Sequence, residues 1–286
     1  MPLRAAFTVL AIVFLSRPLD ASEPVRVTTL VETTADGPQR IFVARIDLRQ
    51  PGVDLRVPGP VATRSGDPKG TEARLESVPE FARRVGATLT INGNFFAQLP
   101  GAPSRWTEGQ PVALVGPSVS EGRVVSHGNR KGLGHPALLL TRDRQAHIKC
   151  ALEKDLAGKD DVVAGVSHPK TGGCLLVENG KNSGEKASAS LRARHPRTAA
   201  GLTRDRRELI LVVVDGRQPG WSIGMTLPEL GALMIRLGAH TALNFDGGGS
   251  SSFLYRPAGG ATVTNRPSDG SWRPVANQLA VVLRAP

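Results

Sequence analysis

The segment from Ala242 to Tyr255 combines residue types that could form a ligand site. It places Asp246 between two apolar runs, directly before three glycines and three serines. Backbone with so few side chains exposes N–H groups that a ligand can approach closely, and here a carboxylate stands beside them. The alternative is a hairpin, because Asp-Gly is also a strong turn signal. A two-residue turn does not need six small residues, which favours a site.

A helix and a strand are expected to position a second polar residue earlier in the chain. Ser77-Val78-Pro79-Glu80 has the pattern of a capping box with proline in the first turn, and it predicts a helix ending at Gly86. A strand over 87–91 then leads directly into Asn92.

The same order of signals precedes Asp246. Thr226-Leu227-Pro228-Glu229 is a second capping box, Gly238 ends the helix, and a strand over 239–243 leads into Asn244. The two units predict an internal pseudo-repeat whose strand ends converge on one site. Chance similarity is the alternative, because capping signals are common at helix starts.

The remaining elements are mostly strands, and 56–74 is expected to be a loop. Strands are predicted at 25–32, 41–48, 111–115, 123–126, 137–141, 162–166, 175–177, 197–202, 208–214 and 278–283. No low-complexity tract divides the chain. We expect an α+β fold, a single strand-dominated domain over 22–286 with a mixed or antiparallel sheet and a few helices.

Residues 1–21 have the pattern of a secretory signal peptide. Arg4 precedes an apolar run over 5–15, and the segment ends at Ala21. The run is shorter than the roughly 20 residues that span a bilayer as a helix. We therefore expect export, with no stable membrane anchor after cleavage; periplasm, cell surface and medium stay open.

In an exported protein, Cys150 and Cys174 are expected to form a disulfide. The six histidines are scattered without metal-ligand spacing, so a histidine-bound metal is not predicted. An oxygen-ligated divalent cation at Asp246 or Asp215 stays open, although two aspartates are weak evidence for one. No cofactor is expected to be required.

The chain is strongly basic, with 36 Lys and Arg against 25 Asp and Glu and a net charge of +11. Such a surface attracts polyanions, which include nucleic acid, anionic lipid and phosphate-bearing envelope polymers. Aromatic residues make up only 4% of the chain, too few for the stacking platforms of single-strand binders. Together with export, this argues against nucleic acid as a partner.

Five segments in order resemble the phosphodiester glycosidase family. They are Ile91–Phe96 (INGNFF), Arg197–Gly201 (RTAAG), Val214–Arg217 (VDGR), Asn244–Ser251 (NFDGGGSS), and Asn265–Gly270 (NRPSDG) with Arg273–Asn277 (RPVAN). The resemblance extends from about Ser77 to the C-terminus. The segment from Ser22 to Arg74 carries no matching motif, and Gly165 to Gly173 is longer than usual.

The resemblance implies cleavage between a sugar's anomeric carbon and a phosphate, which leaves free sugar and a phosphomonoester. The transition state of such a reaction is oxocarbenium-like and needs a nearby carboxylate. Asp246 is the first candidate and Asp215 the second. Because phosphate leaves as a stable anion, cationic donors matter more than a strong general acid.

The family segments also supply candidate substrate-binding residues. Guanidinium groups can hold two phosphate oxygens, amides can bind sugar hydroxyls, and backbone N–H groups with a hydroxyl can form an anion nest. The candidates are Arg197, Arg217 and Arg266 for phosphate, Asn92, Asn94 and Asn244 for sugar, Gly248, Gly249 and Ser250 for the nest, and Thr198 and Asn265 within the same segments. Each has a structural alternative: an arginine could pair with Asp215, an asparagine could form a turn, and the serines could be small strand residues.

The sequence thus predicts an exported hydrolase acting on a sugar-1-phosphodiester or an anionic glycopolymer. Two rival functions stay open: a non-catalytic binder of anionic polysaccharide, and a metal-dependent phosphodiesterase that cleaves on the phosphate side. A serine nucleophile is not supported, because Asp246 to Ser252 does not match the G-x-S-x-G pattern.

Overall fold

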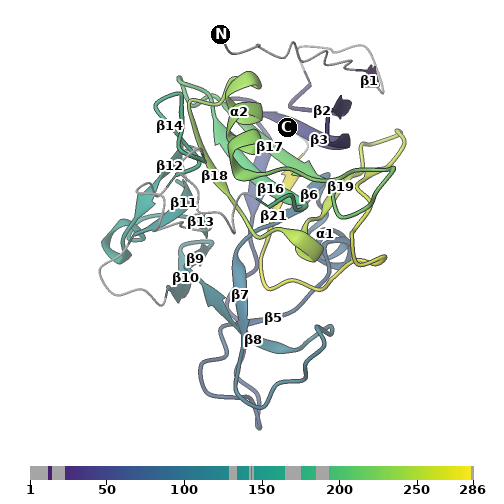
Figure 1. Ribbon diagram of the computed structural model, residues 1–286. Coiled ribbons are helices and arrows are strands. Elements are labelled where there is room, and N and C mark those ends of the chain that lie inside the picture. The colour runs from purple at the N-terminus through teal and green to yellow at the C-terminus, as the bar shows by residue number, and fades with distance from the viewer. Residues whose placement is uncertain are drawn as a thin grey trace.

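Two β-sheets pack face to face, and each carries a helix on its outer side (Figure 1). The structure, a computed structural model, describes residues 12–14, 23–128, 134–141, 143, 145–164, 175–184 and 193–284. Helix α2 (Leu227–Arg236) covers the larger sheet, and helix α1 (Val78–Val85) covers the smaller one. The main core lies between the sheets, where Phe42 meets Phe253 at 5.6 Å between ring centroids.

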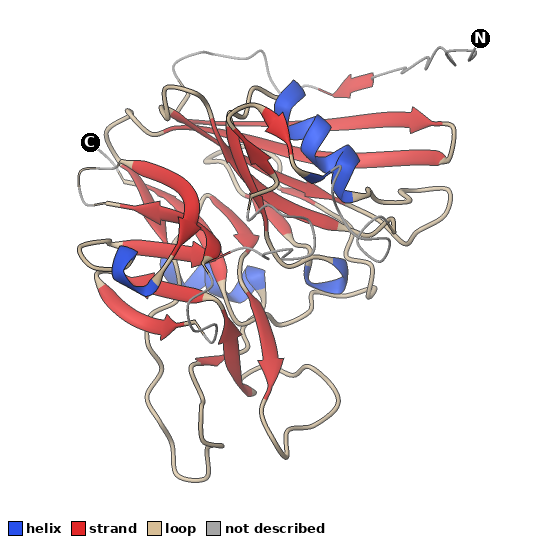
Figure 2. Cartoon of the chain, turned by 60° about the vertical axis from the view of Figure 1, so that its left-hand side comes forward, coloured by secondary structure: helices blue, strands red, loops and turns tan. Residues whose placement is uncertain are grey.

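The larger sheet has eight strands, and Figure 2 shows α2 lying across it. In spatial order they are β1 (Ile12–Phe14), β2 (Val25–Thr34), β3 (Gly37–Asp47), β17 (Glu208–Val214), β16 (Arg197–Leu202), β18 (Thr241–Asn244), β14 (Val177–Glu178) and β15 (Lys181–Asn182). The central strands β16 and β17 are buried on both faces, by α2 on one side and by the second sheet on the other. This explains why β17 is a continuous apolar run rather than an alternating pattern.

The smaller sheet of the sandwich has five strands. They are β20 (Val263–Thr264), β19 (Phe253–Tyr255), β6 (Leu89–Asn92), β21 (Gln278–Leu283) and β4 (Val53–Arg56). Apolar residues of β6 such as Ile91 face the shared core. Helix α1 contacts β6, β19 and β21 from the other side.

Two further sheets complete the described part of the chain. One contains β10 (Arg123–His127), β9 (Pro117–Ser120), β13 (Asp161–Ala164), β11 (His135–Leu140) and β12 (Ala146–Ala151). The other contains β5 (Ala73–Arg74), β8 (Pro111–Val115) and β7 (Phe95–Gln98), and lies at the bottom of Figure 1. All strand pairings among the described residues are antiparallel.

The second capping box is confirmed and the first is wrong. At α2, Thr226 Oγ1 accepts from Glu229 N–H at 3.3 Å, and Glu229 Oε2 accepts from Thr226 N–H at 2.9 Å. At α1 the Ser77 side chain makes no cap, and the Ser77 N–H instead donates to Glu108 Oε1 at 2.9 Å. Glu80 pairs with Arg83 on the exposed face of α1. The proline in the first turn and the left-handed stop at Gly86 are confirmed.

The predicted strand-dominated α+β fold is confirmed, with antiparallel sheets. The predicted strands start and end within about four residues of observed ones, but β4, β7, β9, β12, β15 and β20 were not predicted. The expected loop over 56–74 contains the last residue of β4 and the two-residue strand β5. The expected signal peptide lies outside the described residues except for β1, which pairs with β2. No helix in the described part of the chain is long and apolar enough to cross a membrane. Cys150 lies on β12, but Cys174 is outside the described residues, so the disulfide stays a prediction.

The register of the larger sheet brings distant segments together. Strand β16 is antiparallel to both of its neighbours, and it pairs Arg197 with Val214 and Ala199 with Asn244. The start of β16 therefore lies beside the ends of β17 and β18. The two strand ends of the suggested pseudo-repeat, at Asn92 and Asn244, also approach each other, although the repeat itself stays a prediction.

Candidate active site

The candidate site lies where β6, β17 and β18 end and β16 begins. The chain leaving β18 bridges the two sheets: the Phe245 N–H donates to the Thr198 carbonyl at 2.8 Å, and the Asp246 N–H donates to the Gly93 carbonyl at 3.0 Å. The 3-10 turn η5 (Gly248–Ser250) follows directly. The structure thus brings together the segments that carry the predicted site residues.

The Asn92 side chain links the end of β6 to β16 and to the chain that follows β18. Its Nδ2 donates to the Asp246 carbonyl at 2.8 Å, and its Oδ1 accepts from Thr198 Oγ1 at 2.8 Å and from Ser252 N–H at 3.0 Å. Asn92 and Thr198 are completely buried. Their predicted role in binding substrate is therefore replaced by a bracing role, because their polar atoms bind the protein itself.

Asp246 carries a buried carboxyl group whose pKa is raised toward neutral pH. The residue is only 8% exposed, and burial raises the pKa of the carboxyl group to about 7. The Gly247 N–H, which donates to Oδ1 at 2.8 Å, and the charge of Arg273 oppose this rise. The Ser250 hydroxyl also favours the ionised form, without a hydrogen bond of ordinary geometry. A carboxyl group with such a pKa can exchange protons near neutrality.

Arg217 places a guanidinium over the glycine turn. A Cβ at Gly248 would lie 3.1 Å from both Arg217 Nη1 and Nη2, so a larger residue would push the guanidinium aside by a few tenths of an ångström. The same guanidinium donates to His195 Nδ1, with Nη2 at 3.2 Å. Burial and the neighbouring guanidinium groups lower the pKa of His195, which favours the neutral ring that accepts this hydrogen bond.

A second cation, Arg273, covers the next glycine of the turn. Arg273 pairs with Asp269 at 2.6 Å, and a Cβ at Gly249 would lie 2.2 Å from Arg273 Nη2 and 2.4 Å from both Asp269 carboxylate oxygens. Sequence reasoning included both residues in the family segments but gave neither a role. His195, which carries no motif of its own, was missed entirely.

Arg197 is buried, and its guanidinium group binds backbone carbonyl groups close to the start of β16. Its Nε donates to the Met225 carbonyl at 2.8 Å, and its Nη2 donates to the Ala193 carbonyl at 2.9 Å. Burial and the charge of Arg217 lower the pKa of Arg197 to about 10. The two guanidinium groups therefore repel each other, and an anion near them would relieve this repulsion.

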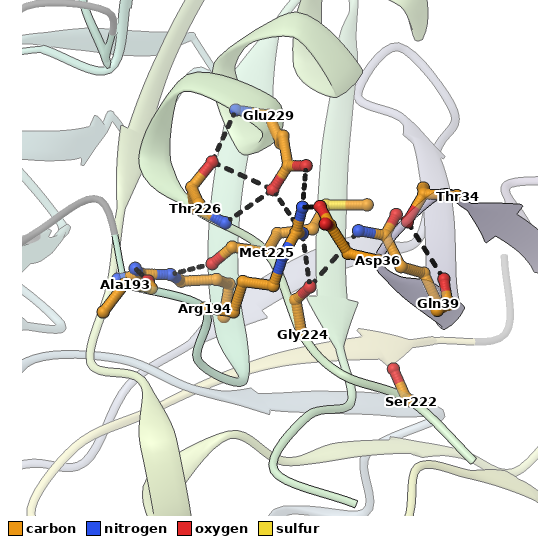
Figure 3. A network of polar contacts seen from close by, with 12 residues as sticks. Thr34, Asp36, Gln39, Ala193, Arg194, Ser222, Gly224, Met225, Thr226 and Glu229 are labelled. Atoms are coloured by element: carbon orange, nitrogen blue, oxygen red, sulfur yellow. Dashed lines mark hydrogen bonds and ion pairs between the residues drawn. The ribbon is translucent and has the colours of Figure 1, made fainter. Parts of the chain in front are cut away.

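A neighbouring network fixes the same segment to α2, as Figure 3 shows. Arg194 forms a two-point pair with Glu229, with both N–O distances at 2.7 Å, and also contacts Asp36 in the β2–β3 turn. Glu229 is the carboxylate of the confirmed capping box, so one side chain caps the helix and anchors the arginine. This network therefore holds the chain that enters β16 in a fixed position relative to α2.

The carboxylate oxygens of Asp215 accept hydrogen bonds from three donors of the protein itself. It accepts from Trp221 Nε1 at 2.9 Å, from Asn265 Nδ2 at 3.0 Å, and from the Arg266 N–H at 3.1 Å. Burial nevertheless raises its pKa. Three N–H donors make this carboxylate a brace, and they oppose both its predicted catalytic role and a metal there.

Asn265 is likewise corrected from a substrate ligand to a brace. Besides binding Asp215, its Nδ2 donates to the Ser251 carbonyl at 3.0 Å and its Oδ1 accepts from the Phe253 N–H at 2.7 Å. Both N–H donors and one acceptor position of the amide are thus used. The side chain of Arg266 lies over the Trp221 ring, with 5.4 Å from Cζ to the ring centroid.

The other predicted ligands divide into engaged and available groups. Asn94 Nδ2 donates to the Pro117 carbonyl at 3.1 Å, and the Gly248 N–H donates to the Pro196 carbonyl at 3.0 Å, which removes Gly248 from the proposed nest. Asn244 Nδ2 donates to the Phe245 carbonyl at 2.9 Å, but Asn244 Oδ1 is buried without a hydrogen-bond partner among the described residues. A buried amide oxygen without a protein partner is suited to a ligand or an ordered water molecule.

The described residues contain no group of three or more His, Cys, Asp and Glu that could hold a metal ion. The neighbours that act on the Asp246 carboxylate are the Ser250 hydroxyl, the Gly247 N–H and Arg273. The donor set therefore suits an anion better than a cation.

Comparisons with known proteins agree with this arrangement. The sequence model of the phosphodiester glycosidase family matches residues 85–282. The N-acetylglucosamine-1-phosphodiester alpha-N-acetylglucosaminidase of Bos taurus is 27% identical over 254 residues, which cover 82% of this chain and 45% of that protein. This chain thus spans about half the length of the curated relative it matches.

Solved structures show the same fold. The catalytic domain of the zebrafish enzyme of that name, auto-inhibited by its pro-peptide, aligns with a TM-score of 0.66 at 19% identity, over 96% of this chain and 88% of that chain. A Burkholderia pseudomallei protein assigned as exported aligns with a TM-score of 0.58 at 20% identity, over 86% of this chain and 74% of that chain. With more than half of its length matched by the family's sequence model, this chain belongs to the phosphodiester glycosidase family.

Proposed function

We propose that this chain is an exported hydrolase that cleaves the bond between the anomeric carbon and the phosphate of a sugar-1-phosphodiester, in an envelope or extracellular glycoconjugate. The observation that carries the proposal is the Asp246 carboxyl group, which is buried at a strand end, has a pKa near 7 and lies beside Arg273. Family membership over residues 85–282 supports the same reaction class.

In the proposed reaction, Asp246 acts as a general base on a water molecule. Asp246 accepts a proton from a water molecule, whose oxygen bonds to the anomeric carbon. The bond from that carbon to the phosphate oxygen breaks, its electron pair stays on the oxygen, and the phosphomonoester leaves as an anion. A pKa near the working pH suits such a base.

The cationic groups stabilise the departing phosphate. Arg217 and Arg273 each cover a glycine of the turn that follows Asp246, and the charge of Arg273 acts on the Asp246 carboxylate. Guanidinium groups fixed where negative charge develops lower the barrier, because they do not reorient during the reaction. Burial and, to a smaller extent, repulsion from Arg217 lower the pKa of Arg197, and this repulsion supports an anionic occupant.

The substrate class follows from charge and from the expected location. A net charge of +11 suits a phosphate-bearing polymer. The predicted signal peptide would bring the protein to such a polymer outside the cytoplasm. The likeness to a Burkholderia protein assigned as exported supports this location.

Hydrolysis in oxygen-18 water tests the proposal. A synthetic sugar-1-phosphodiester is incubated with the protein, and the products are analysed by mass spectrometry. Label in the anomeric hydroxyl of the released sugar is expected. Label in the phosphate would contradict the proposal, because it would mean attack on phosphorus. Tight binding of an anionic polysaccharide without turnover of any sugar phosphodiester would instead favour a non-catalytic binder.

A further inference from the structure

A second basic pocket lies at the opposite end of the strands that carry the active site. It is a cavity of about 170 Å³ between β12, the β16–β17 turn and the start of β18. Its basic and aromatic polar lining comes from His147, Lys149, Arg204, Arg206 and His240, and two threonines complete the polar lining. Since β16 runs from Arg197 to Leu202 at about 3.3 Å per residue, the pocket is roughly 20 Å from Asp246.

No carboxylate contributes to the lining of this pocket. The cavity beside Arg56 differs, because Asp54 and Glu121 line it and pair with its arginines. Arg204 and Arg206 are exposed, and no carboxylate among the described residues lies within ion-pair distance of either. Their charges are therefore available to an anion.

The contact between Arg206 and His147 shows how the positive charge is concentrated. Arg206 has a left-handed backbone, with φ at 58°, and its Nη1 lies 2.8 Å from His147 Nδ1. A guanidinium can only donate, so Nδ1 accepts and the neutral ring carries its proton on Nε2. The ring turns an acceptor toward Arg206 but does not neutralise its charge.

The carboxylates nearest to the pocket are already engaged. Asp155 pairs with Lys149 at 2.6 Å, and Asp205 accepts from the Thr203 hydroxyl at 2.7 Å. Burial, Arg206, Lys159 and Lys149 lower the pKa of His147, and Asp143 opposes them only weakly. The potential at the ring is thus positive despite these carboxylates.

We propose that this pocket binds a phosphate group, held by Arg204, Arg206 and the ring edges of His147 and His240. Guanidinium groups match phosphate oxygens in charge and geometry, and the cavity is large enough for one tetrahedral anion. The phosphate comes either from a free phosphate ester or from another phosphate of a polymeric substrate. The binding chemistry is the same in both cases.

Binding of inorganic phosphate to the whole protein tests this assignment. The ring Cε1–Hε1 signals are followed by NMR as phosphate is added at constant ionic strength, with His147→Gln used for assignment. A saturable shift of the His147 signal is expected, together with a rise in its pKa. A shift no larger than that caused by the same ionic strength of chloride would overturn the proposal.

Matched variants locate the binding. The double variant Arg204→Gln with Arg206→Asn should weaken phosphate binding by about tenfold or more, and Asn tolerates the left-handed backbone at 206. Arg207→Gln, an exposed neighbour beside Asp205, should leave binding within about twofold. Equal affinity in the wild type and the double variant would place the phosphate elsewhere and contradict the assignment.

The source of the phosphate is resolved by a second ligand. An oligomer of several sugar-1-phosphodiester units is compared with inorganic phosphate in the same NMR titration, using protein with Asp246→Asn to avoid turnover. Tighter binding of the oligomer that disappears in the double variant identifies the polymer as the source. Equal binding of the two ligands identifies a free phosphate ester. Both results support the pocket, and the titration with inorganic phosphate does not depend on the catalytic proposal.

Discussion

Asn92 Nδ2 lies 2.8 Å from the backbone carbonyl oxygen of Asp246, although 154 residues separate them in the sequence. The contact joins the end of a strand in one sheet to the loop that leaves a strand in the other. The position of the Asp246 carboxylate therefore depends on how the two sheets are packed. The buried Asn92 amide and the hydrogen bond from the Asp246 N–H to the Gly93 carbonyl transmit this packing to the loop.

Asn92→Ala should lower both stability and turnover. It removes three buried hydrogen bonds and leaves their partners unsatisfied, so the free energy of unfolding should fall by about 2–4 kcal/mol. The kcat should fall more than the KM rises, because the loop carrying Asp246 loses its anchor. Urea unfolding and steady-state kinetics measure the two effects.

Thr90→Val is the matched control on the same strand. Thr90 is also completely buried, but its hydroxyl has no hydrogen-bond partner among the described residues. Its replacement should leave stability unchanged or higher. An Asn92→Ala protein as stable and active as Thr90→Val would show that the amide does not position the loop.

The stability of the protein should depend on pH through two buried carboxyl groups. Burial raises the pKa of Asp246 and of Asp161 from 3.8 to about 7, so the folded state holds these protons more tightly than the unfolded state. Their effect is absent below about pH 4, and it lowers stability progressively as the pH rises to about 7. Above that pH the cost is complete.

Asp246→Asn and Asp161→Asn should each remove one of these costs. At pH 8 each variant should be more stable than the wild type by about 1–3 kcal/mol, and the difference should vanish near pH 4. Denaturant unfolding across this range provides the measurement. A gain that is constant with pH would mean that ionisation of these carboxyl groups is not its cause.

Arg217→Gln should slow the reaction because it removes a guanidinium beside the leaving phosphate. A loss of about 100-fold in kcat/KM is expected, and Arg217→Lys should recover only part of it, because an ammonium keeps the charge without the two-point geometry. Arg83→Gln, on the exposed face of α1, is the control and should be unchanged. Similar rates for Arg217→Gln and Arg83→Gln would exclude Arg217 from the reaction.

Gly249→Ala should separate activity from folding. The added methyl would collide with the ends of two flexible side chains, Arg273 and Asp269, which can move aside. Stability should change by less than about 1 kcal/mol, whereas activity should fall by about 10- to 100-fold as Arg273 is displaced. The apparent pKa of the rate profile should also rise, because Arg273 lowers the pKa of Asp246.

Gly59→Ala provides the comparison for that variant. A methyl at Gly59 would meet only ordinary contacts at 3.8 Å, to Arg123 and Ser120. Normal activity in both glycine variants would show that the Arg273–Asp269 pair is not needed at the site.

The convergence of the candidate segments could be predicted from the sequence, but the contacts of several of their side chains could not. The apolar runs before Asn92 and Asn244 are local signals, so the strand ends were predicted correctly. Whether an amide at such an end faces substrate or protein depends on the packing of a second sheet. No local pattern reveals that the Asn92 and Asn265 side chains form their hydrogen bonds with other residues of the protein.

The wrong capping box at α1 has the same kind of cause. Ser77 and Glu80 satisfy the local pattern, but Glu108, from a distant loop, takes the Ser77 N–H. His195 could not be found either, since its importance comes from Arg217 and not from its own neighbours in the sequence. Contacts between distant segments decided each of these outcomes.

The turnover of Asp246→Asn on a sugar-1-phosphodiester, compared with that of Asp161→Asn, tests the central claim most directly. Both variants neutralise a buried carboxyl group whose pKa is raised to about 7, but only Asp246 lies at the site. Asp246→Asn is expected to retain less than about 1% of wild-type kcat, and Asp161→Asn to stay within about threefold of it. A folded Asp246→Asn protein as active as Asp161→Asn would contradict the assignment of Asp246 as the catalytic carboxylate.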